Sequence, residues 1–169
     1  KHVANDILLN YGKAKLITAT NVFAHIDNIN EVVKLIKKIL LDDGIFITES
    51  HYLLSLIRNL QYDTIYHEHL RYYSLNSLKY LFEKHDLEII TAKQISTHGG
   101  SIRVYAARKG VYPKNNNVAI ILEQELKELS MDNFNKFRAR VMLSKLKLYR
   151  HLLNVKKDGN KIYGIGAPS

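Results

Sequence analysis

The sequence predicts an α/β fold organised around a parallel sheet. Two apolar, β-favouring runs, residues 15–23 and 44–50, are separated by an amphipathic run at residues 28–43, which is the order of a strand–helix–strand unit. Both apolar runs end abruptly in polar side chains. Because ligands of open parallel sheets bind beyond the carboxyl ends of the strands, we expect functional residues at these two strand ends.

The composition of the chain excludes several classes of protein and of site. The chain has 169 residues, of which 46% are hydrophobic, enough for a soluble domain with its own core. It contains no Cys, so disulfides and thiolate metal sites are excluded within it. No apolar run approaches the roughly 18 residues that span a bilayer, and we expect a cytoplasmic protein with no membrane partner. No signal peptide is visible, and the start at Lys1 rather than Met predicts a fragment.

The strand–helix–strand unit is predicted in some detail. Residues 15–23 are apolar on both faces, which is typical of a central parallel strand. The following helix is capped by Asn28 or Asn30 and stopped by Asp43 and Gly44. Its apolar stripe consists of Val32, Val33, Leu35, Ile36, Ile39 and Leu40.

The remaining elements of the first 110 residues follow from the same patterns. Helices are predicted at residues 2–10, 52–60 and 74–85. Strands are predicted at residues 86–97 and 101–108, and because only a glycine turn separates them we expect an antiparallel pair. An antiparallel strand at one edge of a parallel sheet is a known mixed arrangement.

After residue 110 the composition changes to a Pro- and Asn-containing linker, then two helices at residues 118–129 and 132–156. The second carries an apolar seam that could pack on the domain or form a homodimer through the Phe134–Val155 stretch. Residues 161–169 are predicted to begin a strand that enters a Gly-x-Gly loop. The seam consists of Phe134, Phe137, Val141, Leu148, Leu152 and Val155.

Positive charge is concentrated in the same region. The formal net charge is +9, and residues 134–157 contain eight basic side chains and no acidic one. Such a face could attract nucleic acid, a membrane surface or phosphorylated ligands. The simpler interpretation is a solvated helix face, which we favour, so no nucleic-acid partner is expected.

The run from Tyr62 to His69 concentrates two tyrosines, an aspartate, a glutamate and two histidines in eight residues. One interpretation is proton transfer, with His67 or His69 as a base oriented by Glu68 and assisted by Tyr66. A second is a metal site, and a third is a polar surface loop. We favour proton transfer, because clustered titratable groups are typical of active sites. The metal ligands would come from His25, His51, His67, His69, Glu49 and Glu68.

Two further groups are candidates for ligand binding. The turn at His98, Gly99, Gly100 and Ser101, with Arg103 beyond it, could bind an anion, although its glycines could equally serve only the turn. At the end of the first strand, Asn21 and His25 could contact a ligand, although His25 could instead be a capping or buried histidine.

Several uncommon motifs occur here in the order in which the sugar C-methyltransferases carry them. Those enzymes use S-adenosylmethionine and act on dTDP-linked 4-keto-deoxysugars, and the resemblance covers about residues 16–169. The motifs are Asn21-Val-Phe-Ala-His25-Ile-Asp, Glu49-x-His-Tyr52, Tyr62-Asp-x-Ile-Tyr66-His-Glu68-His69, His98-Gly-Gly-Ser-x-Arg103-Val-Tyr and Gly164-x-Gly-Ala-Pro-Ser169.

The resemblance implies a fold: the C-terminal half of a class I (Rossmann-like) methyltransferase sheet, ending in an antiparallel strand pair. Residues 1–110 would be this partial methyltransferase domain and residues 111–159 a linker with connecting helices. Residues 160–169 would be the first strand of a second Rossmann-like domain. The family's zinc-binding N-terminal domain would precede them.

The resemblance also implies a site. The family removes a proton next to the ketone of a nucleotide-linked sugar, and the resulting enolate carbon attacks the methyl group of S-adenosylmethionine. By position His69 resembles the base, with Tyr66, Glu68 and His25 as its catalytic neighbours. Asn21 and Phe23 would lie near the cofactor. The substrate-binding candidates are Glu49, Tyr52, His98, Gly99, Gly100, Ser101 and Arg103.

The departures from the family pattern concern the cofactor. The zinc-binding cysteines and the cofactor-binding glycine loop are not in this sequence. We therefore expect weak binding of S-adenosylmethionine and little or no activity. The alternatives are a metal-dependent hydrolase or lyase using His67, His69 and Glu68, and a non-enzymatic basic helical interaction module.

Overall fold

The structure is a computed structural model in which residues 2–166 are described. The chain divides into two compact units, Lys1–Ser130 and Met131–Ser169.

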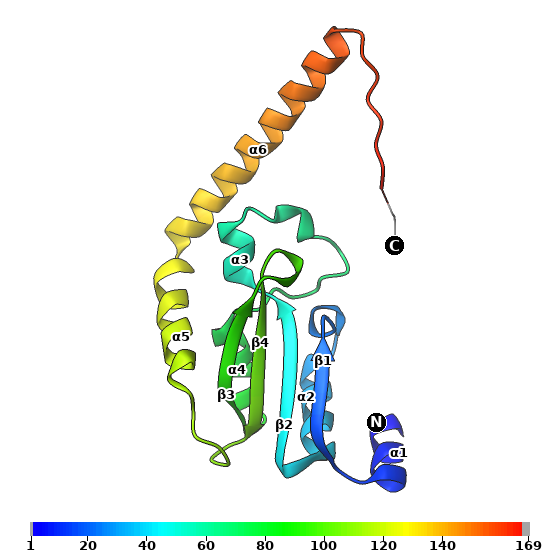
Figure 1. Cartoon of the computed structure of the whole chain (residues 1–169), viewed down its shortest axis with the longest axis vertical. Helices are drawn as coiled ribbons and strands as arrows, with labels where there is room; N and C mark the ends of the chain where they lie inside the picture. The colour runs from blue at the N-terminus through cyan, green and yellow to red at the C-terminus, as the bar shows by residue number, and fades with distance from the viewer. Residues whose placement is uncertain (1, 167–169) are drawn as a thin grey trace. The chain divides into compact units, whose positions relative to one another are not determined.

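The first unit is built on a four-stranded mixed sheet in the order β1-β2-β4-β3 (Figure 1). The parallel neighbours β1 (Ala14–Thr20) and β2 (Leu40–His51) and the antiparallel pair β3 (Leu87–Ile95) and β4 (Ser101–Arg108) confirm the predicted α/β class.

Two details of the predicted sheet are wrong. The antiparallel strand β4 does not lie at the edge but between β2 and β3, and it pairs with both. An inner position suits its sequence, because Ile102, Val104 and Ala106 are all fully buried there. Strand β1, predicted to be central, is an edge strand of the sheet formed by the described residues, and Leu16 on it is 56% exposed.

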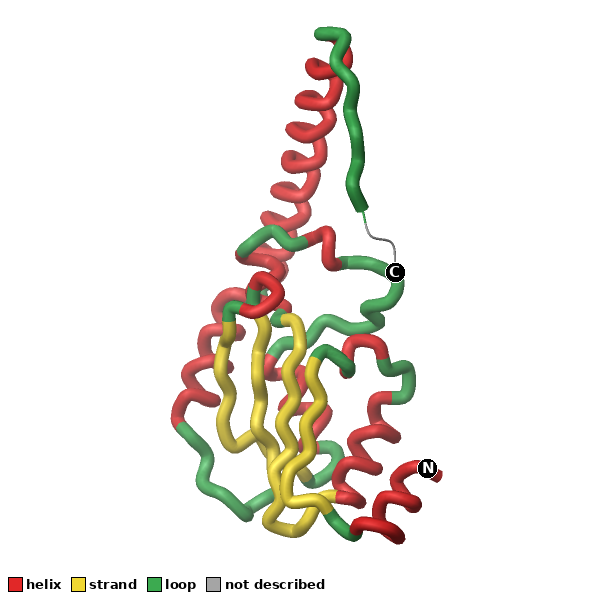
Figure 2. The backbone as a smooth tube through the Cα atoms, turned by 45° about the vertical axis from the view of Figure 1, so that its right-hand side comes forward, coloured by secondary structure: helices red, strands yellow, loops and turns green. Residues whose placement is uncertain are grey.

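Five helices accompany the sheet. Figures 1 and 2 show α2 and α4 side by side on the same face of the sheet, while α1 packs against α2. Helix α2 ends earlier than predicted, because β2 already begins at Leu40, which pairs with Ala14 of β1. The helices are α1 (His2–Tyr11), α2 (Ile29–Ile39), α3 (Leu53–Arg58), α4 (Leu75–Glu83) and α5 (Asn116–Glu128).

Side-chain caps fix where two of these helices begin. The Asn28 carboxamide oxygen accepts a hydrogen bond from the Glu31 N–H at 3.2 Å, so Asn28 is the predicted cap. Ser74 and Ser77 form a reciprocal capping box at the start of α4. Because each cap satisfies otherwise unpaired N–H groups, both helix starts are defined within one residue.

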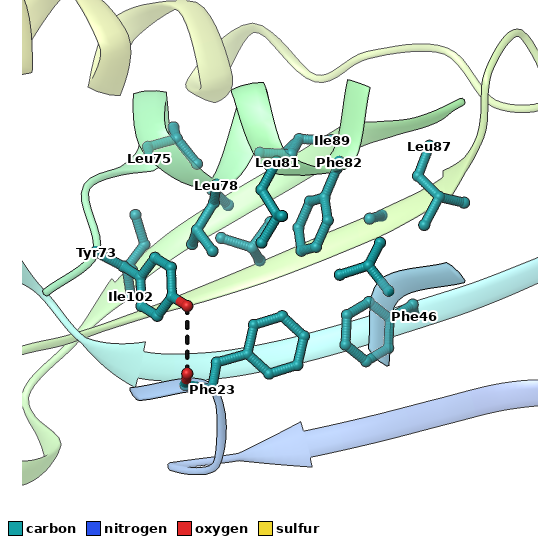
Figure 3. Packing of buried hydrophobic residues seen from close by; sticks show 14 of the residues in the cluster. Phe23, Phe46, Tyr73, Leu75, Leu78, Leu81, Phe82, Leu87, Ile89 and Ile102 are labelled. Atoms are coloured by element: carbon teal, nitrogen blue, oxygen red, sulfur yellow. Dashed lines mark hydrogen bonds between the residues drawn. The ribbon is translucent and has the colours of Figure 1, made fainter. Parts of the chain in front are cut away.

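The core of the unit is aromatic where the sheet meets α4. The rings of Phe23 and Phe46 stack at 5.6 Å, and Phe82 of α4 meets Phe46 edge-on at 5.9 Å. Figure 3 shows these rings beneath the leucines of α4, with the Tyr73 hydroxyl donating to the Phe23 carbonyl at 3.2 Å. Each fully buried large apolar side chain contributes about 1.5–3 kcal/mol to folding. This packing holds the chain segments that enter the site.

Helix α5 belongs to the first unit, which therefore extends to residue 130 and beyond the boundary expected at residue 110. Val118 and Ile121 insert into the core. The Glu125 carboxylate is buried and accepts hydrogen bonds from the Tyr52 hydroxyl and from two backbone N–H groups at the start of α4. The linker before α5 is thus a loop within the unit.

The second unit consists of the long helix α6 (Met131–Lys157), in which no residue is buried, followed by an irregular segment. The strand predicted from residue 161 is not formed over residues 161–166, where no neighbouring strand supplies hydrogen bonds in the part of the chain the structure describes. Residues 167–169 of the predicted glycine loop lie outside the described residues. None of the described helices is long and apolar enough to cross a membrane.

Candidate active site

A pocket of about 280 Å³ opens at the carboxyl ends of β1 and β2. That volume is close to the lower end of the range of roughly 300–1,000 Å³ typical of small-molecule sites. Figure 1 shows the loop that follows α3 beside the ends of these strands. The lining comprises Asn21, Ala24, His25, Ser50, His51, Thr64, Tyr66, His69 and His98.

Two loops that are distant in sequence are hydrogen-bonded to each other beside this pocket. One contains the short 3₁₀ helix η1 (Phe23–His25), and the other follows the 3₁₀ helix η2 (Tyr62–Thr64). These bonds place the tyrosine- and histidine-rich run directly against the end of β1. The pairs, donor first, are His25 with Glu68, Leu70 with Ala24, Tyr73 with Phe23, and Arg71 with Ile26 and Asp27.

Both ring nitrogens of His69 have partners. Its Nδ1 lies 3.0 Å from the Thr64 carbonyl, which can only accept, so Nδ1 carries the proton of the neutral ring. Its Nε2 then has the free lone pair and accepts from the Tyr66 hydroxyl at 3.2 Å. The ring is therefore oriented by a backbone carbonyl and a phenol rather than by the Glu68 carboxylate that the sequence suggested. This tautomer is the one a general base requires.

The surroundings of His69 lower its pKa below the ordinary value of 6.5. Partial burial is the main cause, and the nearby His25 and His51 act in the same direction, while the Thr64 carbonyl and Glu68 oppose them. The rings of His25 and His69 lie 5.0 Å apart. His69 is accordingly neutral, and able to accept a proton, at neutral pH.

The His98 turn is held by close packing rather than by flexible contacts. Its backbone is left-handed at His98, with φ of 51°, and at Gly99, with φ of 77°. A Cβ on Gly99 would lie 1.5 Å from the Gln61 amide nitrogen, and Gln61 in turn accepts from His51 Nε2 at 3.1 Å. Gly99 and Gly100 therefore do not line the pocket but allow His98 and His51 to do so.

Glu49 and Arg103, both predicted to bind substrate, instead bind each other. They are direct cross-strand partners, and Arg103 donates to Glu49 Oε2 through two nitrogens at 2.8 and 3.0 Å. The Thr97 hydroxyl donates to Glu49 Oε1 at 3.1 Å, which fixes the start of the His98 turn. Ser101 is likewise turned inward, with its hydroxyl donating to the Thr97 carbonyl. These residues support the pocket from outside its lining.

Two other predicted residues lie in the core. Phe23, expected near the cofactor, is 1% exposed and stacks on Phe46. Tyr52, expected near the substrate, is fully buried and donates to Glu125 at 2.9 Å. Burial and the neighbouring carboxylate raise the pKa of Tyr52 well above its ordinary value. The structure thus does not bring either side chain to the pocket.

Three lining residues were not among the predicted site residues, namely Ala24, Ser50 and Thr64, and His51 was predicted only as a possible metal ligand. Ser50 and His51 follow the second apolar run, so the strand-end pattern contained a signal for them. Thr64 acts through its carbonyl, for which no sequence signal exists. Among the described residues, no group of three or more His, Cys, Asp or Glu side chains is placed to hold a metal ion.

Comparison with known proteins gives matches over almost the whole chain. A family model described as "Methyltransferase domain" matches residues 2–92, and one described as "C-methyltransferase C-terminal domain" matches residues 96–169. The C-methyltransferase NovU of Streptomyces niveus is 35% identical over 170 residues, covering 99% of this chain. The chain spans about 40% of the length of that relative.

Solved structures with a similar fold are more distant. The magnesium protoporphyrin IX methyltransferase of Synechocystis PCC 6803, determined with bound SAH, is 12% identical with a TM-score of 0.45, over 64% of this chain and 57% of its own. The mitomycin 7-O-methyltransferase MmcR is 14% identical with a TM-score of 0.46, over 56% of this chain and 30% of its own.

Proposed function

Because the chain belongs to the methyltransferase family, and its motifs resemble the sugar C-methyltransferases within it, we propose that its pocket performs the proton abstraction of a C-methylation. The observation that carries the proposal is the geometry of His69. Its tautomer is fixed, its Nε2 is basic, and its pKa is lowered by burial inside a pocket. A neutral imidazole facing a ligand-sized space is suited to remove a proton next to a ketone.

The chemistry proposed for the residues of this chain is a single proton transfer. The substrate takes the place of the Tyr66 hydroxyl at His69 Nε2, and the C–H electron pair moves into a new C=C bond as the carbonyl oxygen becomes an enolate. The displaced phenol of Tyr66 is then free to donate to an oxygen of the substrate. The ring of His25, 5.0 Å from His69, limits the space around the base.

S-adenosylmethionine is the cofactor that membership of the methyltransferase family implies, and it would supply the methyl group when bound. The described residues fit only part of it. The lining of the pocket contains no carboxylate, the group that holds nucleoside ribose hydroxyls in related folds. The lining therefore suits the substrate and the reacting end, and weak binding of S-adenosylmethionine by this chain stays a prediction.

The substrate proposed for the site is a nucleotide-linked deoxysugar with a ketone. Imidazole, hydroxyl and carboxamide groups in the lining can pair with sugar hydroxyl and carbonyl oxygens. The activity of the whole protein, a cytoplasmic location and a homodimer through the Phe134–Val155 stretch all remain proposals. The family match disfavours both a metal-dependent hydrolase or lyase and a helical interaction module.

The proton step can be tested without the methyl donor. The purified chain is mixed in D₂O with a dTDP-linked 4-keto-deoxysugar, and exchange at the carbons next to the ketone is followed by proton NMR. We expect exchange above the protein-free rate, and a loss of about 10²–10⁴-fold in His69→Gln, the range that a positioned base contributes.

His67→Gln is the matched control, because His67 is exposed and does not line the pocket. It should keep exchange close to the wild-type rate. Equal exchange by His69→Gln and wild type would show that the base is assigned wrongly. No exchange above background by the wild-type chain would overturn the proposed function itself.

A further inference from the structure

Ser50 is a buried residue of the pocket that the proton step has not used. It lies near the end of β2, is 2% exposed, and lines the pocket beside His51. Its Oγ has no hydrogen-bond partner in the part of the chain the structure describes. A buried hydroxyl without a partner is disfavoured in a folded protein, and each such group calls for an explanation, of which a ligand that supplies the missing bond is one.

The other hydroxyl groups of the lining are already engaged. The Tyr66 hydroxyl donates to His69, and the Thr64 hydroxyl donates to the Gln61 carbonyl at 2.8 Å. Ser50 therefore offers a donor that needs no rearrangement before a ligand oxygen arrives. Donors held in place before the reaction are the most effective stabilisers of charge that develops during it.

Thr48 is a useful comparison, because its hydroxyl also has no partner among the described residues but lies away from the pocket. It lies two residues earlier on β2, so its side chain is on the same face of the strand as that of Ser50. Its Oγ1 is also buried without a partner, but Thr48 does not line the pocket. The two residues thus differ in access to a ligand and not in burial.

We propose that the Ser50 hydroxyl binds the ketone oxygen of the substrate and stabilises the enolate that forms when His69 removes the neighbouring proton. This inference rests on the proposed function and deepens it. As the C–H bond breaks, its electron pair becomes the C=C bond and the negative charge settles on the oxygen that Ser50 faces. The proton resides on His69 Nε2, from which it exchanges with solvent.

The test compares Ser50→Ala with Thr48→Val in the exchange assay, over a range of keto-sugar concentrations. Because the bond to Ser50 strengthens as charge develops, Ser50→Ala should lower the kcat of exchange about 10- to 100-fold, with a much smaller change in KM. Thr48→Val should stay within about twofold of wild type in both constants. Both variants should melt at or above the wild-type temperature, because each loses an unpaired buried hydroxyl.

The possible outcomes separate the role of Ser50 from that of His69 and from the proposed function. A fall in kcat with unchanged melting supports the role of Ser50. Wild-type exchange by Ser50→Ala, or a large drop in its melting temperature, would overturn that role while leaving His69 as the base. Exchange lost equally in Thr48→Val would also overturn it. A wild-type chain that exchanges nothing would remove the proposed function together with this inference.

Discussion

Two of the buried polar clusters in the first unit are built in opposite ways. Around Glu125, every donor has its acceptor: the carboxylate receives the Tyr52 hydroxyl and the N–H groups of Leu75 and Asn76. In the pocket, by contrast, the Ser50 hydroxyl has no partner within the described chain. A cluster whose bonds are complete contributes stability, whereas one with open bonds retains capacity for a ligand.

The backbone conformations of the pocket lining and of the Glu125 cluster also differ. Asn21 and His98, both in the pocket lining, adopt left-handed conformations with φ of 54° and 51°. By contrast, none of the described residues that form the Glu125 cluster has a positive φ. Left-handed non-glycine residues are disfavoured, and they concentrate where a site requires them. Left-handed backbone and an unpartnered hydroxyl thus occur together in the pocket lining, whereas Leu60 and Asp86, the other described non-glycine residues with positive φ, lie outside it.

The largest expected effect tests the satisfied cluster. Glu125→Ala leaves two N–H groups of α4 and the Tyr52 hydroxyl without an acceptor, and we expect a loss of about 3–5 kcal/mol in the free energy of unfolding. Urea denaturation at pH 7 measures it. Glu123→Ala is the control on the same helix, since Glu123 is exposed and forms an i,i+4 ion pair with Lys127, and it should change stability by about 0.5 kcal/mol. Similar losses of stability in Glu125→Ala and Glu123→Ala would refute the contrast between the two clusters.

A smaller effect tests how tightly the His98 turn, which borders the pocket, is packed. Gly100 has φ of 129°, and a Cβ there would lie 2.4 Å from the Ser55 Cβ. We expect Gly100→Ala to destabilise the chain by about 2–4 kcal/mol, because strain and overlap add. Gly110→Ala has positive φ but open space around it, so about 1 kcal/mol is expected. If calorimetric melting shows equal effects, the turn is looser than its packing implies.

The smallest effect concerns pH. Because the pKa of His69 lies below 6.5, lowering the pH from 7.5 to 6.5 should reduce the exchange rate by less than about twofold, and the steep fall should come at lower pH. His25→Gln removes one cause of the lowered pKa, so the midpoint should move up towards 6.5. Exchange profiles from pH 5 to 8 measure both. A wild-type midpoint above 6.5 would contradict the effect of burial.

Most elements of the fold could be predicted, because each depends on a local pattern. Asn28 and Ser74 cap the helices they were expected to cap, and the glycine turn joins an antiparallel pair. The place of β4 in the sheet could not be predicted in this way. It depends on whether the β2 edge pairs with β4 or with another strand, which local periodicity does not encode.

The site was predictable in its chemistry and less so in its geometry. His69 and Tyr66 were identified by residue type and lie together in the pocket. Glu49 and Arg103 were also identified by type, but each neutralises the other. Tyr52 turns into the core, where its hydroxyl donates to Glu125, and a motif contains no information on that direction. Ser50 was indicated only by its place at the end of the second apolar run, and its buried, unpartnered hydroxyl is what distinguishes it in the structure.

The position of β4 between β2 and β3 has a consequence for synthesis on the ribosome. Arg103 meets Glu49 across 54 residues of chain, and the His98 turn immediately precedes β4. The strand ends that carry Asn21 and Ser50 therefore emerge long before the segment that completes their surroundings. Non-local pairing of this kind is slow to form. A nascent chain halted before the His98 turn would display the histidine-rich loop without one side of the pocket lining, so the pocket cannot be complete until that turn has been made.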